Sequence, residues 1–202
     1  LKHASNVPQC AETIEAIFRD AGLPEHLFTT LFVDSDEIAE VIASPHVQAV
    51  TLTGSEAAGR KVGALAGQHL KKCVLELGGS DPFIVLHDAD VELAVEQAVA
   101  SRYLNCGQSC IAAKRFIVVP EIADQFVQLM RERAMGLKSG DPSSEGVHLG
   151  PMAKREIRDE LQGQVDDAIK HGATVLLGCE PPPGTGSYYP ASILDKVTPA
   201  MR

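Results

Sequence analysis

Two cysteines in the stretch NCGQSCIAAKR, Cys106 and Cys110, stand four residues apart and raise the question of what their thiols do. A zinc site would need further soft ligands at short spacing, and the other three cysteines each stand alone in the sequence. A disulfide framework is typical of small secreted chains with an even cysteine count, whereas this chain has 5 cysteines. Two alternatives remain, a reactive thiol and a buried, inert one.

Cys110 is the better candidate for a nucleophile, because Gly107 and Gln108 precede it in a turn that can present the sulfur to a cleft. The amides of Asn105 and Gln108 either donate hydrogen bonds to a reacting group or cap the end of a preceding helix. A further alternative is a redox sensor that uses Cys106 and Cys110 as a reversible pair, although a spacing of four residues is awkward for a disulfide.

Glu76 lies among apolar residues near the end of a predicted strand, in the stretch CVLELGGSDP. A charge in such a place is costly unless it has a partner or a task. One alternative is a structural carboxylate that caps a turn or pairs with a lysine. The other is a general base, since a carboxyl in a partly apolar pocket can take a proton from water or from a thiol near neutral pH.

Glycines follow another predicted strand in the stretch AVTLTGSEAAGRKVG, with Gly54 and Ser55 first and Gly59 and Gly63 further on. Glycines at such a place allow a ligand to approach the backbone closely, and the start of the next helix offers N–H groups to a phosphate. The spacing is not GxGxxG, so a tight turn with close helix–strand packing is an equal alternative.

The elements that must position these residues alternate between helices and strands. Apolar periodicity predicts helices at residues 9–21, 36–44, from Gly54 onward, 91–103, 122–135 and 153–170. Short apolar runs predict strands at residues 27–33, 47–53, 71–77, 82–86, 115–119 and 174–178. This alternation predicts an α/β fold with parallel strands covered by helices, and the pair Gly78–Gly79 is the expected boundary between two sheets.

The composition excludes several classes of protein. A net charge of -9 and no cluster of Lys and Arg argue against nucleic acid as the main partner. No apolar stretch approaches the roughly 20 residues that span a bilayer, so no membrane partner is expected. Isolated cysteines without a signal-like segment favour a reducing compartment, and a cytoplasmic location is the expectation.

Three motifs in this order, LTGS…G, ELGGSDPFIV and NCGQSCIAAKR, closely resemble the aldehyde dehydrogenase family. The stretches LKHASNVP, AGLP, GDP…LGPM and YYPASIL add to the resemblance, which covers essentially the whole chain. It implies a partial, Rossmann-like cofactor domain at residues 1–79 and an incomplete α/β catalytic domain at residues 80–202. Family members are more than twice this length, so the chain is expected to be an internal stretch with little activity of its own.

The resemblance implies roles for the two candidate catalytic residues. Cys110 matches the family's nucleophile, which forms a thioester with the aldehyde carbon, and Glu76 matches the base that activates the hydrolytic water. The carboxylate of Glu76 speaks against the branch that transfers the acyl group to coenzyme A. The backbone N–H of Cys110 is expected to be one donor of an oxyanion hole.

The resemblance also implies a nicotinamide cofactor, NADP or NAD, and a homo-oligomeric parent protein. Lys2 matches a lysine that holds the adenosine ribose, while Gly54, Ser55 and Gly78 match residues near the cofactor. Many NAD-preferring relatives carry a glutamate where this chain has Ser5. Because a small neutral side chain does not repel a 2′-phosphate, NADP is expected to be accepted, together with NAD.

The sequence is most similar to the branch of the family that oxidises succinate semialdehyde, a substrate whose carboxylate calls for an arginine. Some relatives place that arginine where this chain has Leu104. Arg102 lies two residues earlier and is one candidate for the clamp, while Arg115 is equally expected to be structural. Ala112 stands where a redox-switched relative has a second cysteine, which argues against that mode of regulation.

Overall fold

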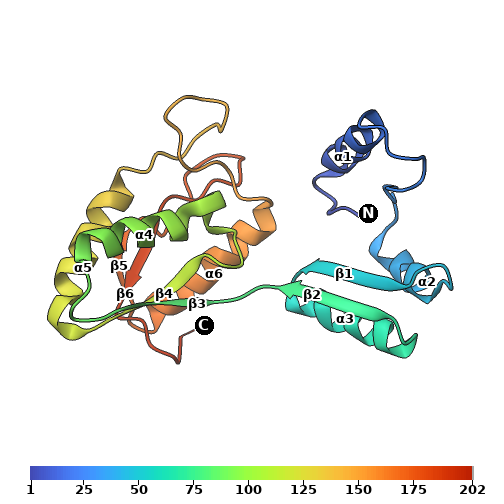
Figure 1. Ribbon diagram of the computed structural model, residues 1–202. Coiled ribbons are helices and arrows are strands. Elements are labelled where there is room, and N and C mark those ends of the chain that lie inside the picture. Colours follow the sequence, from blue (N-terminus) through green and yellow to red (C-terminus); the bar gives the residue numbers. More distant parts are fainter. Residues whose placement is uncertain (202) are drawn as a thin grey trace. The chain divides into compact units, whose positions relative to one another are not determined.

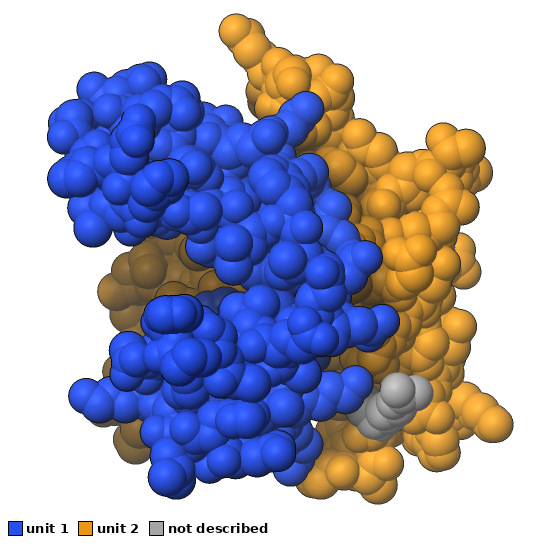
Figure 2. Space-filling view, turned by 90° about the vertical axis from the view of Figure 1, so that its right-hand side faces the viewer, with its two compact units in different colours: residues 1–78 blue, residues 79–202 orange. Residues whose placement is uncertain are grey.

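The computed structural model describes residues 1–201, and the chain divides into two compact units, Leu1–Gly78 and Gly79–Arg202 (Figure 2). Each unit contains its own parallel strand pair with helices beside it (Figure 1). The predicted α/β class is therefore confirmed. The assignment of one unit to cofactor binding and the other to catalysis stays a prediction.

The first unit is built around two parallel strands and the helix that connects them. Its elements are α1 (Pro8–Asp20), η1 (Ser35–Glu37), α2 (Ile38–Ala43), β1 (Ala49–Gly54), α3 (Glu56–Gln68) and β2 (Lys72–Leu77). β1 and β2 pair in parallel, from Ala49 opposite Lys72 to Gly54 opposite Leu77. A parallel pair needs a crossover between its strands, and α3 supplies it.

The strand predicted at residues 27–33 is wrong. This segment makes one isolated bridge, between Lys2 and Leu31, accepts a hydrogen bond from the Leu1 amino group at the Thr29 carbonyl oxygen, and also bonds to α1. The Thr30 N–H donates to Glu15 Oε2 at 2.7 Å, and the Thr30 hydroxyl donates to the carbonyl oxygen of Ala11 at 3.2 Å. The hydrogen bond from the Thr30 backbone N–H lowers the pKa of Glu15. The apolar run therefore serves as a strap across a helix, because its polar groups find partners outside a sheet.

The second unit contains two strand pairs of different kinds. Its elements are β3 (Asp81–Val85), α4 (Val91–Tyr103), η2 (Leu104–Gly107), β4 (Ala113–Val118), α5 (Pro120–Met135), α6 (Arg155–Lys170), β5 (Thr174–Leu177) and β6 (Ile193–Asp195). β3 and β4 are parallel, as expected. β5 and β6 are antiparallel, which corrects the expectation of parallel strands throughout. The loop between β5 and β6 carries no helix, and an antiparallel pair needs none.

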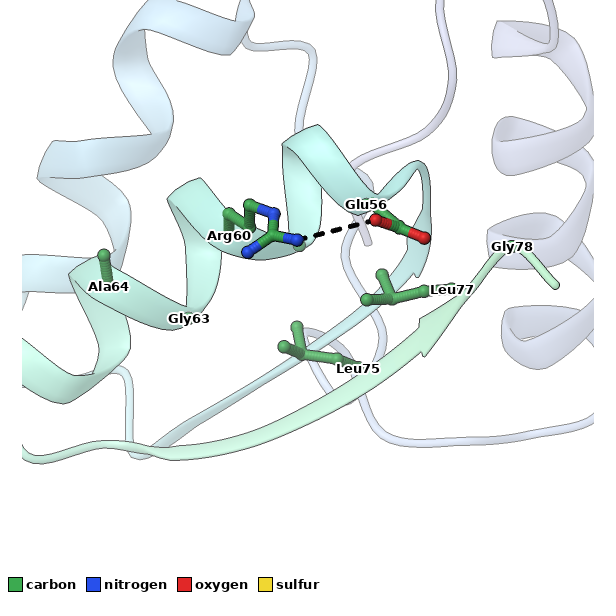
Figure 3. A pocket seen from close by; sticks show the side chains of 8 residues that line it. Glu56, Arg60, Gly63, Ala64, Leu75, Leu77 and Gly78 are labelled. Atoms are coloured by element: carbon green, nitrogen blue, oxygen red, sulfur yellow. Dashed lines mark ion pairs between the residues drawn. The ribbon is translucent and has the colours of Figure 1, made fainter. Parts of the chain in front are cut away.

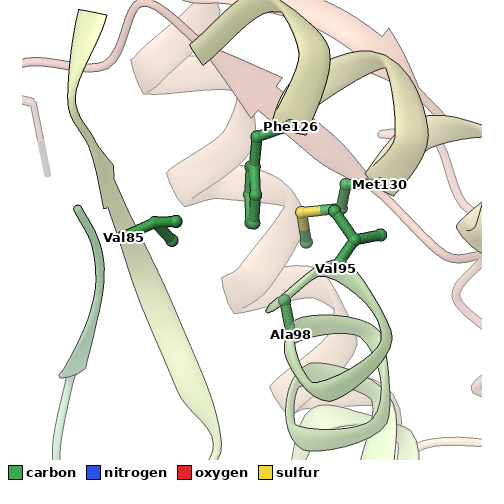
Figure 4. Packing of buried hydrophobic residues seen from close by; sticks show 5 residues of the cluster. All are labelled: Val85, Val95, Ala98, Phe126 and Met130. Atoms are coloured by element: carbon green, nitrogen blue, oxygen red, sulfur yellow. The ribbon is translucent and has the colours of Figure 1, made fainter. Parts of the chain in front are cut away.

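The core of the second unit lies where α4 and α5 cover one face of the β3–β4 pair. Val85, Val95, Ala98, Phe126 and Met130 form this cluster (Figure 4). Side chains alternate between the two faces of a strand, so Val85 is buried while its neighbour Ile84 is 63% exposed. The cluster fixes the α4 helix against the sheet.

The pair Gly78–Gly79 marks the division between the units, although neither glycine has a positive φ. The chain passes from one unit to the other here without left-handed backbone. Among the described residues, no helix is both long and apolar enough to cross a membrane.

Truncation of Phe126 should destabilise the second unit. The ring is 1% exposed, and Phe126→Ala should lower the free energy of unfolding by about 3–5 kcal/mol through lost burial and a residual cavity. Denaturant unfolding followed by circular dichroism measures this change. Ile117→Ala is the control, since Ile117 is 50% exposed, and it should cost about 1 kcal/mol. Equal losses for the two variants would contradict the assigned core.

Titration of Tyr103, the last residue of α4, should destabilise the protein at alkaline pH. Its hydroxyl donates to the Ser192 carbonyl oxygen at 3.1 Å, and burial raises the pKa of Tyr103 from 10.0 to about 12. The neutral phenol therefore contributes stability that is complete below its unfolded pKa and is lost as the pH rises toward its folded pKa. Between pH about 9 and about 12, the wild type should lose on the order of 1–2 kcal/mol more than Tyr103→Phe. Parallel losses in urea titrations would contradict this contribution.

Candidate active site

Cys110 lies in an exposed turn between the end of α4 and the start of β4. The Ala112 N–H donates to the Ser109 carbonyl oxygen at 3.2 Å and closes the turn around the cysteine. Within residues 1–201, the Cys110 N–H donates no backbone hydrogen bond. The turn thus presents both a thiol and a free backbone donor, which are the two groups that attack on a carbonyl carbon requires.

The backbone before this turn is left-handed at three successive positions. Asn105, Cys106 and Gly107 have φ values of 51°, 56° and 77°. Two of the three are not glycine, so the conformation costs free energy, about 1 kcal/mol or more at each. Position 107 favours glycine, because its φ is positive and an added Cβ would displace the Arg102 guanidinium. A strained backbone here is held by its surroundings.

Cys106 is one of the groups that hold it. Its Sγ lies 3.4 Å from the Gly150 carbonyl oxygen, and its side chain packs against the cluster of Ala134, Leu149 and Ala191. Cys106 and Cys110 are both free thiols. The contacts give Cys106 a structural place at the base of the turn.

Gln108 ties the turn to a second segment of the same unit. Its Nε2 donates to the Asn105 carbonyl oxygen at 3.3 Å, and its Oε1 accepts from the Ala153 N–H at 2.9 Å. The amide therefore braces the backbone, which is closer to the capping alternative than to a group that meets a substrate.

Arg102 also points at this backbone. Its Nη1 donates to the Ala113 carbonyl oxygen at 3.0 Å, and its Nη2 donates to the carbonyl oxygen of Gly107. Burial lowers the pKa of Arg102 without making the guanidinium neutral at physiological pH. Two nitrogens of the guanidinium thus bind backbone carbonyls of the turn, which favours a structural role for Arg102 over a clamp for a substrate carboxylate. Arg115 is engaged as well, with Nε 2.9 Å from the Ser80 carbonyl oxygen.

Glu76 lies on β2 of the first unit, opposite Thr53 of β1. Leu75 and Leu77, its neighbours on the strand, face α3, so alternation turns the Glu76 side chain to the other face of the pair. The side chain is exposed within its unit and makes no ion pair with any residue from 1 to 201. The lysine partner of the structural alternative is thus absent in the described chain.

Gly54 and Ser55 lie where β1 passes into α3. Ser55 is the N-cap of α3, and its Oγ accepts a hydrogen bond from the Ala58 N–H at 3.2 Å. The capped helix start lies at the carboxyl end of a parallel strand, a place where anionic ligands bind in many α/β proteins.

A groove of about 450 Å³ lies between α3 and the end of β2 (Figure 3). Its lining residues are Glu56, Gly59, Arg60, Gly63, Ala64, Leu75, Leu77 and Gly78. Figure 3 shows the two leucines extending from β2 toward the helix and the ion pair between Glu56 and Arg60, at 3.6 Å. Leu77 approaches Gly59 so closely that an added Cβ would lie 2.6 Å from its Cδ2. Its leucines are apolar, and Glu56 and Arg60 add charge to its lining.

Of the residues that the sequence predicts for the cofactor, Gly78 lines this groove. Lys2 lies at the N-terminal bridge to Leu31, where its Nζ donates to the His3 carbonyl oxygen at 2.9 Å. Ser5 follows in an exposed turn. Glu56 and Arg60 also line the groove and are not among the residues predicted from the sequence. Their signal is the helical spacing that aligns residues 56, 59, 60 and 63 on one face of α3.

No group of three or more His, Cys, Asp or Glu in the described part of the chain could hold a metal ion.

Comparison with known proteins connects this geometry to relatives. Over 201 residues the chain is 53% identical to a succinate semialdehyde dehydrogenase [NAD(P)+] of Escherichia coli, covering 100% of this chain and 44% of the relative. It is 48% identical over 202 residues to a succinate-semialdehyde dehydrogenase [NADP(+)] of Deinococcus radiodurans, with coverages of 100% and 42%. The chain thus spans less than half the length of these curated relatives.

A solved structure of a relative has the same fold over this stretch. The succinic semialdehyde dehydrogenase of Streptococcus pyogenes in complex with NADP+ superposes with a TM-score of 0.96 at 36% identity, covering 100% of this chain and 44% of that one. The model of the aldehyde dehydrogenase family matches residues 1–202. Because this family model matches the whole chain, the chain belongs to the aldehyde dehydrogenase family.

Proposed function

We propose that this chain forms part of an NAD(P)+-dependent enzyme that oxidises an aldehyde, succinate semialdehyde, to its carboxylic acid. The observation that carries the proposal is the exposed Cys110 turn with its free N–H, in a chain 53% identical to such an enzyme. The chain covers less than half of that relative, so the activity belongs to the full-length protein.

Cys110 would begin the reaction. Its thiolate attacks the aldehyde carbon to form a carbon–sulfur bond, and the oxygen takes up the negative charge, which the Cys110 N–H stabilises by a hydrogen bond. Nicotinamide dinucleotide, when bound, accepts the hydride that leaves this carbon. The carbon is thereby oxidised to a thioester on Cys110.

Glu76 would complete the reaction by hydrolysis. Its carboxylate takes a proton from a water molecule, whose oxygen attacks the thioester carbon, and the acid leaves as the carbon–sulfur bond breaks. A structural carboxylate would be expected to have a partner, and Glu76 makes no ion pair within residues 1–201.

Five residues of the first unit would hold the dinucleotide: Lys2, Ser5, Gly54, Ser55 and Gly78. The groove beside Gly78 is open enough to take part of it, and the start of α3 offers backbone donors to a phosphate. Ser5 supports acceptance of NADP+, because a neutral side chain leaves a 2′-phosphate unrepelled. Residues 1–79 would then be cofactor domain and residues 80–202 catalytic domain.

The choice of succinate semialdehyde rests on the relatives rather than on a clamp in this chain. Leu104 is apolar, Arg102 holds backbone carbonyls and Arg115 donates to the Ser80 carbonyl oxygen. An arginine for the substrate carboxylate would therefore have to come from outside these positions. A homo-oligomeric parent in the cytoplasm is part of the same proposal.

The first test measures cofactor reduction with succinate semialdehyde in the full-length protein. Cys110→Ala should abolish turnover, because no thioester forms, while Glu76→Gln should give a burst of reduced cofactor and then stall before hydrolysis. Cys73→Ala and Glu121→Gln are matched controls at exposed positions and should keep wild-type rates. Activity in Cys110→Ala would overturn the mechanism, and reaction with uncharged aldehydes alone would overturn the substrate.

The second test concerns the cofactor. Ser5→Glu introduces a carboxylate that repels a 2′-phosphate, so kcat/KM for NADP+ should fall by about tenfold to a hundredfold while that for NAD+ changes little. Ser5→Gln has the same size without the charge and should retain NADP+ use. Equal losses with both cofactors would show that residue 5 lies away from the ribose phosphate.

A further inference from the structure

The turn that carries Cys110 is held by two cationic side chains that bind its carbonyl oxygens. Residues 107–113, called here the nucleophile loop, have five carbonyl groups that accept hydrogen bonds from Arg102 or Lys114. Loops of this length commonly leave their carbonyls to water. Here five carbonyl oxygens point toward two side chains. The N–H groups of the same peptides therefore point the other way.

Lys114 binds three of these carbonyls. Its Nζ lies 3.2 Å from the Ser109 oxygen, 3.1 Å from the Cys110 oxygen and 3.1 Å from the Ala112 oxygen. An ammonium group has three N–H donors, so all three are used. Hydrogen bonds from a charged donor are roughly twice as strong as neutral ones, and this makes the arrangement stiff.

Arg102 holds the two ends of the nucleophile loop. Its guanidinium donates to the carbonyls of Gly107 and Ala113, which flank Cys110 on either side. The preceding residue in α4 adds a third bond, since Ser101 Oγ accepts from the Ala113 N–H at 3.1 Å. Consecutive residues at the end of one helix thus fix Ala113 by both its N–H and its C=O.

Because the peptide bond is planar, the binding of a carbonyl oxygen also fixes the direction of the N–H of the next residue. In a trans peptide the C=O of one residue and the N–H of the next point in opposite directions. The Ser109 carbonyl and the Cys110 N–H belong to one peptide group, and no peptide bond within residues 1–201 is cis. The Ser109 oxygen points toward Lys114 and also accepts from the Ala112 N–H at 3.2 Å, so the Cys110 N–H points away from Lys114.

We propose that Lys114 is a positioning residue, which orients the Cys110 N–H as an oxyanion donor by binding the Ser109 carbonyl, with Arg102 fixing the ends of the nucleophile loop. The inference rests on the proposed function of Cys110 as the nucleophile. Lys114 does not touch the substrate in this arrangement. It sets the direction of a donor that matters only when negative charge develops on the aldehyde oxygen.

The test separates two reactions of the same thiol in the full-length protein. Oxidation of succinate semialdehyde needs the oriented N–H, because negative charge develops on the aldehyde oxygen, whereas alkylation of Cys110 by iodoacetamide develops none there. Lys114→Met should lower the burst rate of cofactor reduction by about tenfold to a hundredfold, with KM changed little. Its rate of alkylation at Cys110 should stay within about twofold of wild type, and Lys114→Arg should recover most of the burst rate.

Arg102 provides a second pair of variants. Arg102→Met should slow the burst in the same way. Arg102→Lys should recover part of the burst rate, because an ammonium group does not bind both carbonyl oxygens in the geometry of the guanidinium. Arg131→Met is the matched control. Arg131 Nε donates to the Leu176 carbonyl oxygen at 3.0 Å, so it is also a cation on a backbone carbonyl, but away from the nucleophile loop. It should keep both rates.

Three outcomes overturn the inference: an unchanged burst in Lys114→Met, equal losses of burst and alkylation, or a loss that Lys114→Arg does not reduce. Equal losses would mean that Lys114 acts on the thiol or on the folding of the loop. Cys110→Ala distinguishes failure of the inference from failure of the proposed function. If Cys110→Ala is inactive and Lys114→Met is not impaired, only the positioning role fails.

Discussion

The hydrogen bonds from the end of α4 to the start of β4 are the interaction on which the rest of the second unit depends. Ser101 and Arg102 bind both polar groups of Ala113, and Arg102 also reaches back to Gly107. Between these anchors the chain must leave a helix, pass through left-handed backbone and enter a strand. A guanidinium with several fixed donors suits this task, because one side chain satisfies carbonyls that point from different directions.

The packing of the core fixes the position of the residues that make these hydrogen bonds. α4 carries Val95 and Ala98 into the cluster with Phe126, and Arg102 lies in the last turn of the same helix. A helix that slid along the sheet would move the guanidinium away from both carbonyls at once. The left-handed residues Asn105 and Cys106 cost free energy of about 1 kcal/mol or more each, which is comparable to what one charged hydrogen bond contributes. Packing and polar contacts are therefore coupled at this turn.

Much of the fold could be predicted from the sequence because its signals are local. The helix predicted at residues 91–103 is found as α4, and the strand predicted at residues 47–53 is found as β1 shifted by at most two residues. The strand predicted at residues 27–33 was wrong, since Thr30 bonds to α1 instead of a neighbouring strand. Strand pairing is a property of partners distant in the sequence, and a short apolar run does not encode whether one is available.

The candidate site divides in the same way. The turn that presents Cys110 follows from glycine and small residues close to it in the chain, and a single sequence suffices to suggest it. The arrangement of Arg102 and Lys114 could not be predicted from the sequence, because a long charged side chain can adopt many conformations and reach many partners. Chemistry suggested Arg102 as a clamp for a substrate, while the nearest unsatisfied carbonyls were those of its own backbone turn. A cationic side chain close to a nucleophile therefore binds the unsatisfied carbonyl oxygens of its own turn before it is free to bind a substrate.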